Sequence, residues 1–231
     1  MDQTRPDHLD AVSDHTRRLV ATARGLDDAR GPTLCAGWSR GHVLSHIARN
    51  ADGLAALVRS AVDGTGEPMY ASTEARDADV EAGAGRPVEE LADDVEASAA
   101  ALADQLPRLR PEHAELRLER TPGAFLVKGK NIPFMRLREV VYHHVDLEAG
   151  FTFEDVDADL QRAFLDEEVR RLRALDPPPD LTLRTAEGEE WTVGLGTASV
   201  SGSRAALLGW LARGLTDGVS GEPLPHLPEG R

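Results

Sequence analysis

Two residues in the second half of the chain, Glu139 and His143, combine the types and the spacing of metal ligands. Four positions apart on an α-helix, a carboxylate and an imidazole lie on one face, one turn from each other. Together they can bind a divalent ion, but catalytic zinc usually takes three protein ligands. The same spacing is also typical of an ordinary stabilising pair within a helix. The sequence therefore predicts a metal site only if another element supplies a further ligand.

A second stretch with helical apolar periodicity carries two histidines, His42 and His46, one turn apart. Either could face the ion, and their spacing leaves the choice open. Asp146 lies close to the azimuth of the first pair, and we interpret it as a carboxylate that orients a ligand imidazole or caps a neighbouring helix. Two neutral imidazoles and one carboxylate leave a bound ion with positive charge and an open position.

Water and a thiol are the two groups that such an open position can activate. Ile47, not a glutamate, follows His46, and the chain contains no His-Glu-x-x-His, so the sequence disfavours a zincin protease. The single cysteine, Cys35, falls in an expected loop, where a lone cysteine is usually an inert small side chain. We therefore expect the thiol to come from a cosubstrate and Cys35 to be dispensable.

Four long helices are expected to position these side chains, and an antiparallel four-helix bundle is the economical way to pack them. Capping residues and breakers place the helices at residues 7–26, from Ser39 to the break at 64–66, at 87–106 and at 133–149. The stretch 67–86 is expected to form a short helix or an ordered loop, and 116–130 irregular chain that approaches the site.

The composition changes after Gly150, which predicts a second domain. A helix at 156–175 ends before three prolines, and two alternating stretches, 181–184 and 191–195, predict a hairpin. A third short strand at 198–201 and a helix capped by Ser203 follow, and the proline-rich stretch 222–228 is expected to be extended. The predicted fold is α+β, with a bundle over residues 1–152 and a small α+β domain over 153–231.

Charge and composition exclude several classes of partner. The chain has 26 Lys and Arg residues against 40 Asp and Glu residues, a net charge of −14, so its field repels nucleic acid and anionic lipid. The sequence shows no apolar run long enough for a signal peptide or a membrane span. We expect a cytoplasmic protein, a monomer or a homodimer, that acts on a small molecule.

Two separated motifs resemble those of the mycothiol-dependent maleylpyruvate isomerase family. They are Gly37-Trp38-Ser39 followed by His46, and Arg138-Glu139 followed by His143-His144-Val145-Asp146-Leu147. The resemblance covers most of residues 7–150 and, more loosely, the tail. It implies a DinB-like first domain in which His46, Glu139 and His143 bind zinc, and a sterol-carrier-like second domain.

The resemblance also implies a reaction, and the substrate of this reaction needs positively charged side chains to bind it. Mycothiol, a sugar thiol, adds as a thiolate to the cis double bond of maleylpyruvate, the resulting single bond rotates, and elimination gives the trans product. The carboxylates of this substrate need local cations, for which Arg76, Arg138 and Arg213 are candidates. Arg76 is equally explained as a solvated side chain, and Arg138, which points away from Glu139, as a salt-bridge residue. Alternatives are a mycothiol S-transferase that conjugates electrophiles and a non-catalytic metal- and ligand-binding protein.

Overall fold

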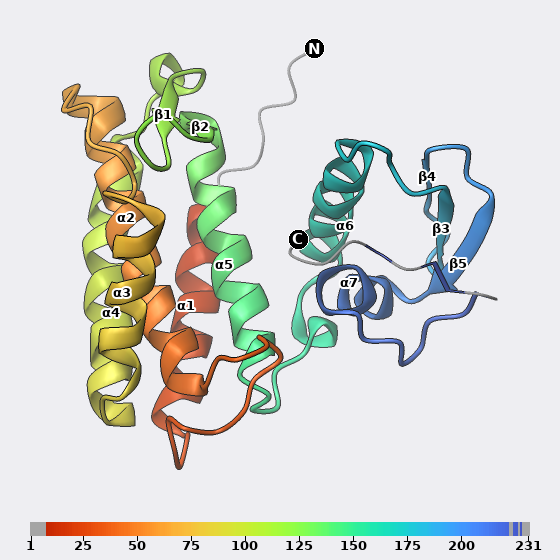
Figure 1. Cartoon of the computed structure of the whole chain (residues 1–231), viewed down its shortest axis with the longest axis horizontal. Coiled ribbons are helices and arrows are strands. Elements are labelled where there is room, and N and C mark those ends of the chain that lie inside the picture. Colours follow the sequence, from red (N-terminus) through yellow and green to blue (C-terminus); the bar gives the residue numbers. More distant parts are fainter. Residues whose placement is uncertain (1–7, 222–223, 226, 228–231) are drawn as a thin grey trace. The chain divides into compact units, whose positions relative to one another are not determined.

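The computed structural model describes residues 8–221, 224, 225 and 227. Its elements fall into two compact units, one up to Ala149 and one from Gly150 (Figure 1). The sequence analysis placed this boundary after residue 152. The described residues contain seven α-helices, a two-stranded sheet and a three-stranded sheet, so the predicted α+β class is confirmed.

Four helices of the first unit form a bundle, and a fifth packs beside them. The bundle consists of α1 (Leu9–Arg24), α2 (Arg40–Asp63), α4 (Val88–Gln105) and α5 (Ile132–Asp146), and α3 (Thr73–Ala84) lies against α2 (Figure 1). Their apolar stripes meet in a core in which Leu44, Ile47, Leu54, Leu57 and Leu137 are completely buried. Each such side chain stabilises the folded state by about 1.5–3 kcal/mol through its removal from water.

The helix directions differ in part from a simple antiparallel order. In a bundle of alternating directions, α2 would be antiparallel to α4 and parallel to α5. The structure shows the reverse, since α2 runs in the same direction as α4 and opposite to α5 (Figure 1). Ion pairs show the parallel register, because Arg49 pairs with Asp94 at 2.6 Å, and Asp63, further along α2, pairs with Arg108 just after α4. Helix α3 makes this possible, since it carries the chain back from the end of α2 to the start of α4.

Helix α3 approaches α2 closely because glycines lie at the contact. A Cβ added to Gly83 would lie 2.2 Å from Ser45 Oγ, and one added to Gly41 would lie 2.1 Å from the carbonyl oxygen of Ala84. Both distances are far too short for a side chain, so the two helices can meet in this way only without one.

Helix α5 begins as predicted and ends earlier than predicted. Pro133 lies in its first turn, where its missing N–H costs nothing. The expected end at Ala149 is wrong, since the helix stops at Asp146 and Glu148 adopts a positive φ of 49°. Arg40 Nε donates to the carbonyl oxygen of Leu147 at 3.0 Å, so a side chain from α2 satisfies a terminal carbonyl of α5.

The stretch 116–130 is a hairpin, not irregular chain. Strands β1 (Arg117–Glu119) and β2 (Leu126–Lys128) pair antiparallel around a turn in which Gly123 has a φ of 73°. Each strand is too short to produce a recognisable alternation in the sequence. The N–H of Met69 donates to the carbonyl oxygen of Glu119, so the hairpin also anchors the chain that leads into α3.

The second unit matches the predicted elements. They are α6 (Ala158–Arg173), β3 (Leu181–Thr185), β4 (Glu190–Val193), β5 (Ala198–Gly202) and α7 (Arg204–Arg213). The sheet order is β4-β3-β5, with β3 antiparallel to β4 and parallel to β5. Ser203 Oγ accepts a hydrogen bond from the N–H of Ala206 at 3.1 Å, which confirms the predicted cap. Most of the stretch 222–228 lies outside the described residues.

Short 3₁₀ turns complete the described elements, at Leu106–Arg108, Pro111–His113, Gly129–Asn131 and Phe153–Asp155. Within the described part of the chain, no helix combines the length and the apolar character that a membrane crossing requires.

Candidate metal centre

Side chains from α2 and α5 meet in the interior of the bundle. Glu139 Oε2 lies 2.8 Å from His46 Nε2 and 3.5 Å from His143 Nε2. One donor atom from each of the three residues lies within 4.8 Å of the other two, which is close enough for all three to bind one ion. The structure therefore brings together the three residues that the sequence analysis selected, and their role as ligands stays a prediction.

The protonation of the three groups follows from burial and from their hydrogen bonds. Burial lowers the pKa of His46 to about 4, although the hydrogen bond with Glu139 acts in the opposite direction, so this imidazole is neutral at pH 7. Burial opposes ionisation of Glu139, but hydrogen bonds from His143 and His46 hold its pKa well below the ordinary value. Burial also opposes the charge of His143, but the hydrogen bond with Asp146 and weaker ones with Cys35 and Glu139 raise its pKa well above normal.

Asp146 fixes the orientation of the His143 ring. Its Oδ2 lies 2.7 Å from His143 Nδ1, and its side chain is completely buried. The Nδ1 proton therefore stays on the side of Asp146, and Nε2 is directed to Glu139 and the other ligands. Carboxylates in this outer position set the tautomer and raise the basicity of a ligand imidazole.

Cys35 lies on the outer side of His143. Its Sγ donates to Asp146 Oδ2 at 3.2 Å and lies 3.9 Å from His143 Nδ1. These three residues form a second group with metal-binding atoms close together. His143 belongs to both groups, and it offers Nδ1 to this one and Nε2 to Glu139, so we interpret Cys35 and Asp146 as support for the first group.

Arg76 of α3 joins the cluster from the other side. Its Nη2 lies 3.1 Å from His46 Nδ1, its Nη1 donates to Asp77 Oδ1 at 2.7 Å, and its side chain is 18% exposed. The interpretation of Arg76 as a solvated surface residue is therefore wrong. Its predicted contact with a substrate carboxylate stays a prediction.

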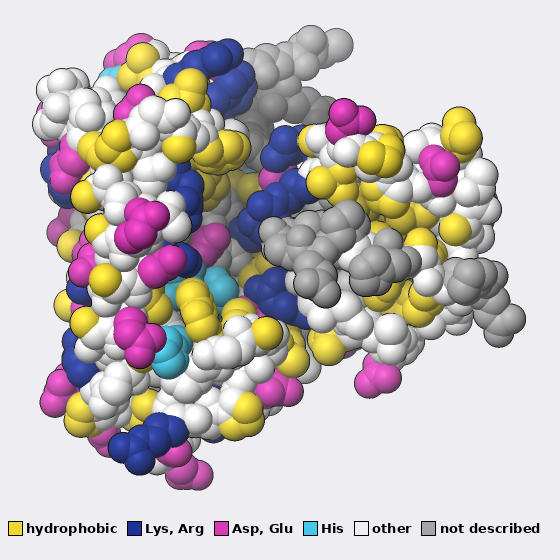
Figure 2. Space-filling model, in the orientation of Figure 1, with side chains coloured by type: hydrophobic (Ala, Val, Ile, Leu, Met, Phe, Trp, Pro, Cys, Tyr) yellow, Lys and Arg dark blue, Asp and Glu magenta, His cyan; other side chains and the backbone are white. Residues whose placement is uncertain are grey.

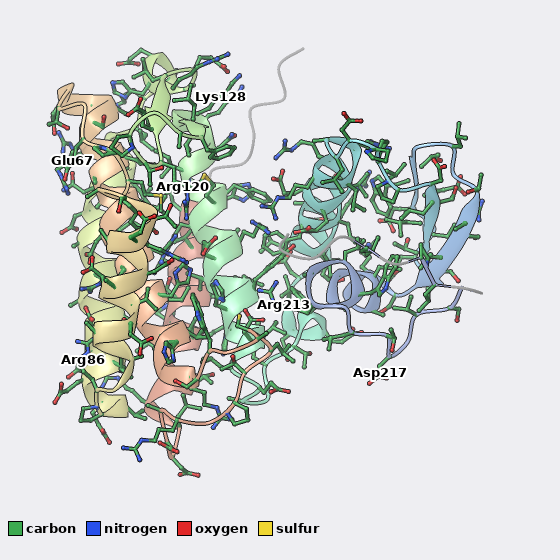
Figure 3. All side chains as sticks on the ribbon, viewed as in Figure 1. Glu67, Arg86, Arg120, Lys128, Arg213 and Asp217 are labelled. Atoms are coloured by element: carbon green, nitrogen blue, oxygen red, sulfur yellow. The ribbon has the colours of Figure 1, made fainter. Side chains whose placement is uncertain are left out.

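A polar cavity of about 620 Å³ adjoins Arg76 between α2 and α3. Four of its lining residues are arginines, namely Arg49, Arg59, Arg76 and Arg86. Figure 3 labels Glu67 and Arg86, two members of its wall. Three acidic residues, Asp52, Glu67 and Asp79, line the same cavity. Each of the four arginines is already ion-paired, so the charges of the wall largely balance.

Trp38 is a site residue that sequence reasoning treated only as a packing residue before the cap of α2. Its ring centroid lies 5.3 Å from that of His46 and 6.3 Å from that of His143, and Arg76 Cζ lies 5.6 Å above it. The N–H of Leu34 donates to the carbonyl oxygen of Asp146, which holds the loop of Trp38 against the end of α5. The ring thus packs beside both histidines of the cluster.

The other histidines of these helices have different partners. His42 Nδ1 accepts from the N–H of Ser39 at 3.1 Å, so His42 helps to cap α2 and lies outside the cluster. Of the two histidines, His46 is the one that the structure places in the cluster. His144 Nε2 lies 2.7 Å from Thr22 Oγ1 on α1. Histidine side chains are visible beside acidic ones on the face of the first unit in Figure 2.

Two further arginines were candidates for the substrate carboxylates. Arg138 Cζ lies 4.8 Å from the ring centroid of Tyr142, so its guanidinium stacks on an aromatic face. The salt bridge expected for Arg138 stays a prediction. Arg213 is the last residue of α7 in the second unit, where its Nη1 donates to the carbonyl oxygen of Ala212 (Figure 3). The predicted catalytic role of Arg213 stays a prediction.

A four-helix bundle with two imidazoles and one carboxylate on two facing helices, followed by a small α+β unit, defines a class of metal-binding bundle proteins. Residues 9–148 match the family model described as the mycothiol maleylpyruvate isomerase N-terminal domain, and the chain belongs to this family.

Solved structures agree with this assignment. A crystal structure of the mycothiol-dependent maleylpyruvate isomerase has a TM-score of 0.85 and 26% sequence identity, over 97% of this chain and 95% of that one. A histidine-to-alanine variant of that enzyme gives the same values. No curated protein matches the chain in sequence.

Proposed function

We propose that this chain is a zinc- and mycothiol-dependent isomerase that converts maleylpyruvate, or a related cis-unsaturated acid, into its trans isomer, fumarylpyruvate. The observation that supports it most strongly is the cluster of His46, Glu139 and His143 with Arg76 beside it. The family of the chain and the 26% identical isomerase structure support the same reaction.

The donor set fits a divalent ion such as zinc. Two imidazoles and an ionised carboxylate are common zinc ligands, and three protein ligands are typical of a catalytic site with a place left for a reactant. Asp146 already holds the outer nitrogen of His143, as such carboxylates do at metal sites. When bound here, zinc would lower the pKa of a thiol that enters the open place, so that the thiolate forms at neutral pH.

The protein side chains then have two tasks. His46, Glu139 and His143 hold the reaction centre inside the bundle, and Trp38 packs beside both histidines. Arg76 binds a carboxylate of the dianionic substrate, because a guanidinium can grip a carboxylate with two parallel hydrogen bonds. In a protein of net charge −14, this contact has to overcome a repulsive overall field.

The reaction balances without an oxidant or a second product. The sulfur of mycothiol forms a bond to one carbon of the cis double bond, and the electron pair moves to the conjugated carbonyl oxygen. The former double bond is now single and rotates. The pair then returns, the carbon–sulfur bond breaks, and the thiolate is released unchanged. Covalent catalysis of this kind divides one difficult rotation into easier steps.

The decisive experiment counts thiols while it follows the substrate. Zinc-loaded protein is mixed with mycothiol and with either maleylpyruvate or a generic electrophile. Formation of the trans acid with no loss of free thiol supports the isomerase. Consumption of one thiol for each electrophile, without isomerisation, would identify an S-transferase instead. Absence of both reactions, with zinc bound, would favour a non-catalytic binding protein and overturn the proposal.

The metal ligands are tested separately by metal analysis. The His46→Ala and His143→Ala variants are expected to lose stoichiometric zinc, because each removes one of three ligands. His42→Ala is the matched control, since His42 lies one turn from His46 on α2 and caps the helix. Equal zinc content and affinity in all three variants would rule out the assigned ligands.

A further inference from the structure

A second cavity, of about 460 Å³, lies between α1 and α4 of the first unit, and its walls include none of the metal-binding cluster. Aliphatic side chains make up most of its wall, among them Val12, Val20, Ala99, Leu102, Ala103 and Leu106. The alanines of α4 leave this space open. A volume of this size with a mostly apolar wall is typical of small-molecule sites.

Arg136 of α5 lines the same cavity with a completely buried side chain. Its Nη1 donates to the carbonyl oxygen of Ile47 at 2.8 Å and to Asn50 Oδ1 at 2.9 Å, but its Nη2 has no hydrogen-bond partner. Burial of a charged group with unused donors is costly, so proteins rarely leave one in this state. The arrangement therefore points to an acceptor that is not part of the chain.

The hydroxyl group of Thr16 on α1 is a second buried polar group without a hydrogen-bond partner. Thr16 Oγ1 is buried without a hydrogen-bond partner, and Thr16 also lines this cavity. Two unpartnered polar atoms, one from α1 and one from α5, thus belong to residues that line one mostly apolar cavity. An acceptor with two oxygens could satisfy both of them.

The charge of Arg136 favours an anion. Burial lowers its pKa only to about 10, so the guanidinium is positive at neutral pH. Glu139, one turn further along α5, stabilises this charge through space, but no hydrogen bond reaches Nη2. At the rim, Arg24 is already paired with Asp93 and Glu96. Arg17, the third arginine of the wall, is paired with Asp14. Since both rim arginines have acidic partners, Arg136 is the cation left for a ligand, which suits a single negative charge.

We propose that this cavity is a binding site for a monocarboxylic acid with an apolar body, of the size of a medium-chain fatty acid. The carboxylate accepts hydrogen bonds from Arg136 Nη2 and Thr16 Oγ1, and the hydrocarbon chain lies between α1 and α4. A planar guanidinium and a carboxylate have matching geometry, and the charge strengthens the bond.

Calorimetric titration of the zinc-loaded full-length protein with octanoate and with 1-octanol tests the charge. Octanoate is expected to bind one to one and at least about tenfold more tightly than the alcohol, because the alcohol cannot neutralise Arg136. Equal binding of the two probes would show a merely apolar cavity. No binding of octanoate at millimolar concentration would overturn the proposal outright.

Two alanines of α4 test the location. Ala99→Leu fills the cavity and is expected to weaken octanoate binding at least about tenfold, because the chain and the new side chain compete for one space. Ala101→Leu is the matched control, since Ala101 is exposed on the same helix and does not line the cavity. Equal binding by both variants would place the octanoate elsewhere and refute the site.

The polar contacts are tested by Thr16→Val and Arg136→Lys, with the fold checked by circular dichroism. Thr16→Val keeps the shape and is expected to weaken octanoate binding several-fold. Arg136→Lys keeps the charge but not the fork of donors, and a larger loss is expected. Unchanged octanoate affinity in folded forms of both variants would contradict the proposal. If Arg136→Lys does not fold, Thr16→Val and the Ala99→Leu comparison still decide.

Discussion

Removal of Asp146 should weaken zinc binding although Asp146 is not a ligand in the proposed site. Its Oδ2 lies 2.7 Å from His143 Nδ1, and because the side chain is completely buried, water cannot take its place. A hydrogen bond to a charged group contributes about 1.5–3 kcal/mol net. Tenfold in affinity corresponds to about 1.4 kcal/mol, so Asp146→Ala should raise the Kd for zinc roughly 10- to 100-fold. Asp146→Asn keeps an acceptor and should cost less.

Two effects of Asp146 oppose each other, and pH separates them. Asp146 orients His143, which favours zinc, but it also raises the pKa of His143, so a proton competes with the ion. The loss in Asp146→Ala should therefore be larger at about pH 9, where this competition is weak, than at about pH 7.

The assay is a competition titration with a chromophoric zinc chelator. Thr22→Val is the matched control, because it removes a 2.7 Å contact with His144, the neighbouring buried histidine of the same helix. This variant should lose stability without a change in zinc affinity. If Asp146→Ala binds zinc as tightly as Thr22→Val does at both pH values, the orienting role of Asp146 is refuted.

Three further outcomes are expected. Arg76→Ala should lower kcat/KM for maleylpyruvate, with a loss of about 2–4 kcal/mol of transition-state stabilisation, and Arg76→Lys should restore only part of this loss. A near-normal kcat/KM in the alanine variant, at full zinc content, would remove Arg76 from the site. Cys35→Ser should keep turnover within about threefold, because serine can still donate to Asp146; loss of turnover with fold and zinc intact would require an internal nucleophile. Zinc binding at pH 7 should release about one proton, because His143 has a raised pKa and must lose its Nε2 proton, whereas His46 is already neutral. Calorimetric titrations in buffers of different ionisation enthalpy measure the number of protons released. Zero release would contradict the protonation states described for the two histidines.

Local signals predicted most helices and strands of this fold. Ser39, Pro133 and Ser203 mark helix starts through their own backbone and side-chain chemistry, and all three starts were correctly placed. The shared face of Glu139 and His143 follows from helix geometry, whereas the choice of His46 over His42 needed the family resemblance or the structure.

The remaining features depend on contacts that no local pattern encodes. Helix α5 ends early because Arg40, about a hundred residues earlier, donates to Leu147. The direction of α4 depends on how α3 returns the chain. A buried Arg136 could not be inferred, because arginine is normally a surface residue and its partners, Ile47 and Asn50, lie on another helix.

The close approach of α3 to α2 connects the position of Arg76 with a glycine two turns away. Gly83 and Arg76 are seven residues apart, so they lie on the same face of α3, two turns from each other. A side chain at position 83 would collide with Ser45, so either Ser45 Oγ turns away or α3 moves and carries the guanidinium of Arg76 with it. Because this guanidinium contacts His46 Nδ1, the spacing of α2 and α3 is coupled through one residue to the cluster on α2 and α5.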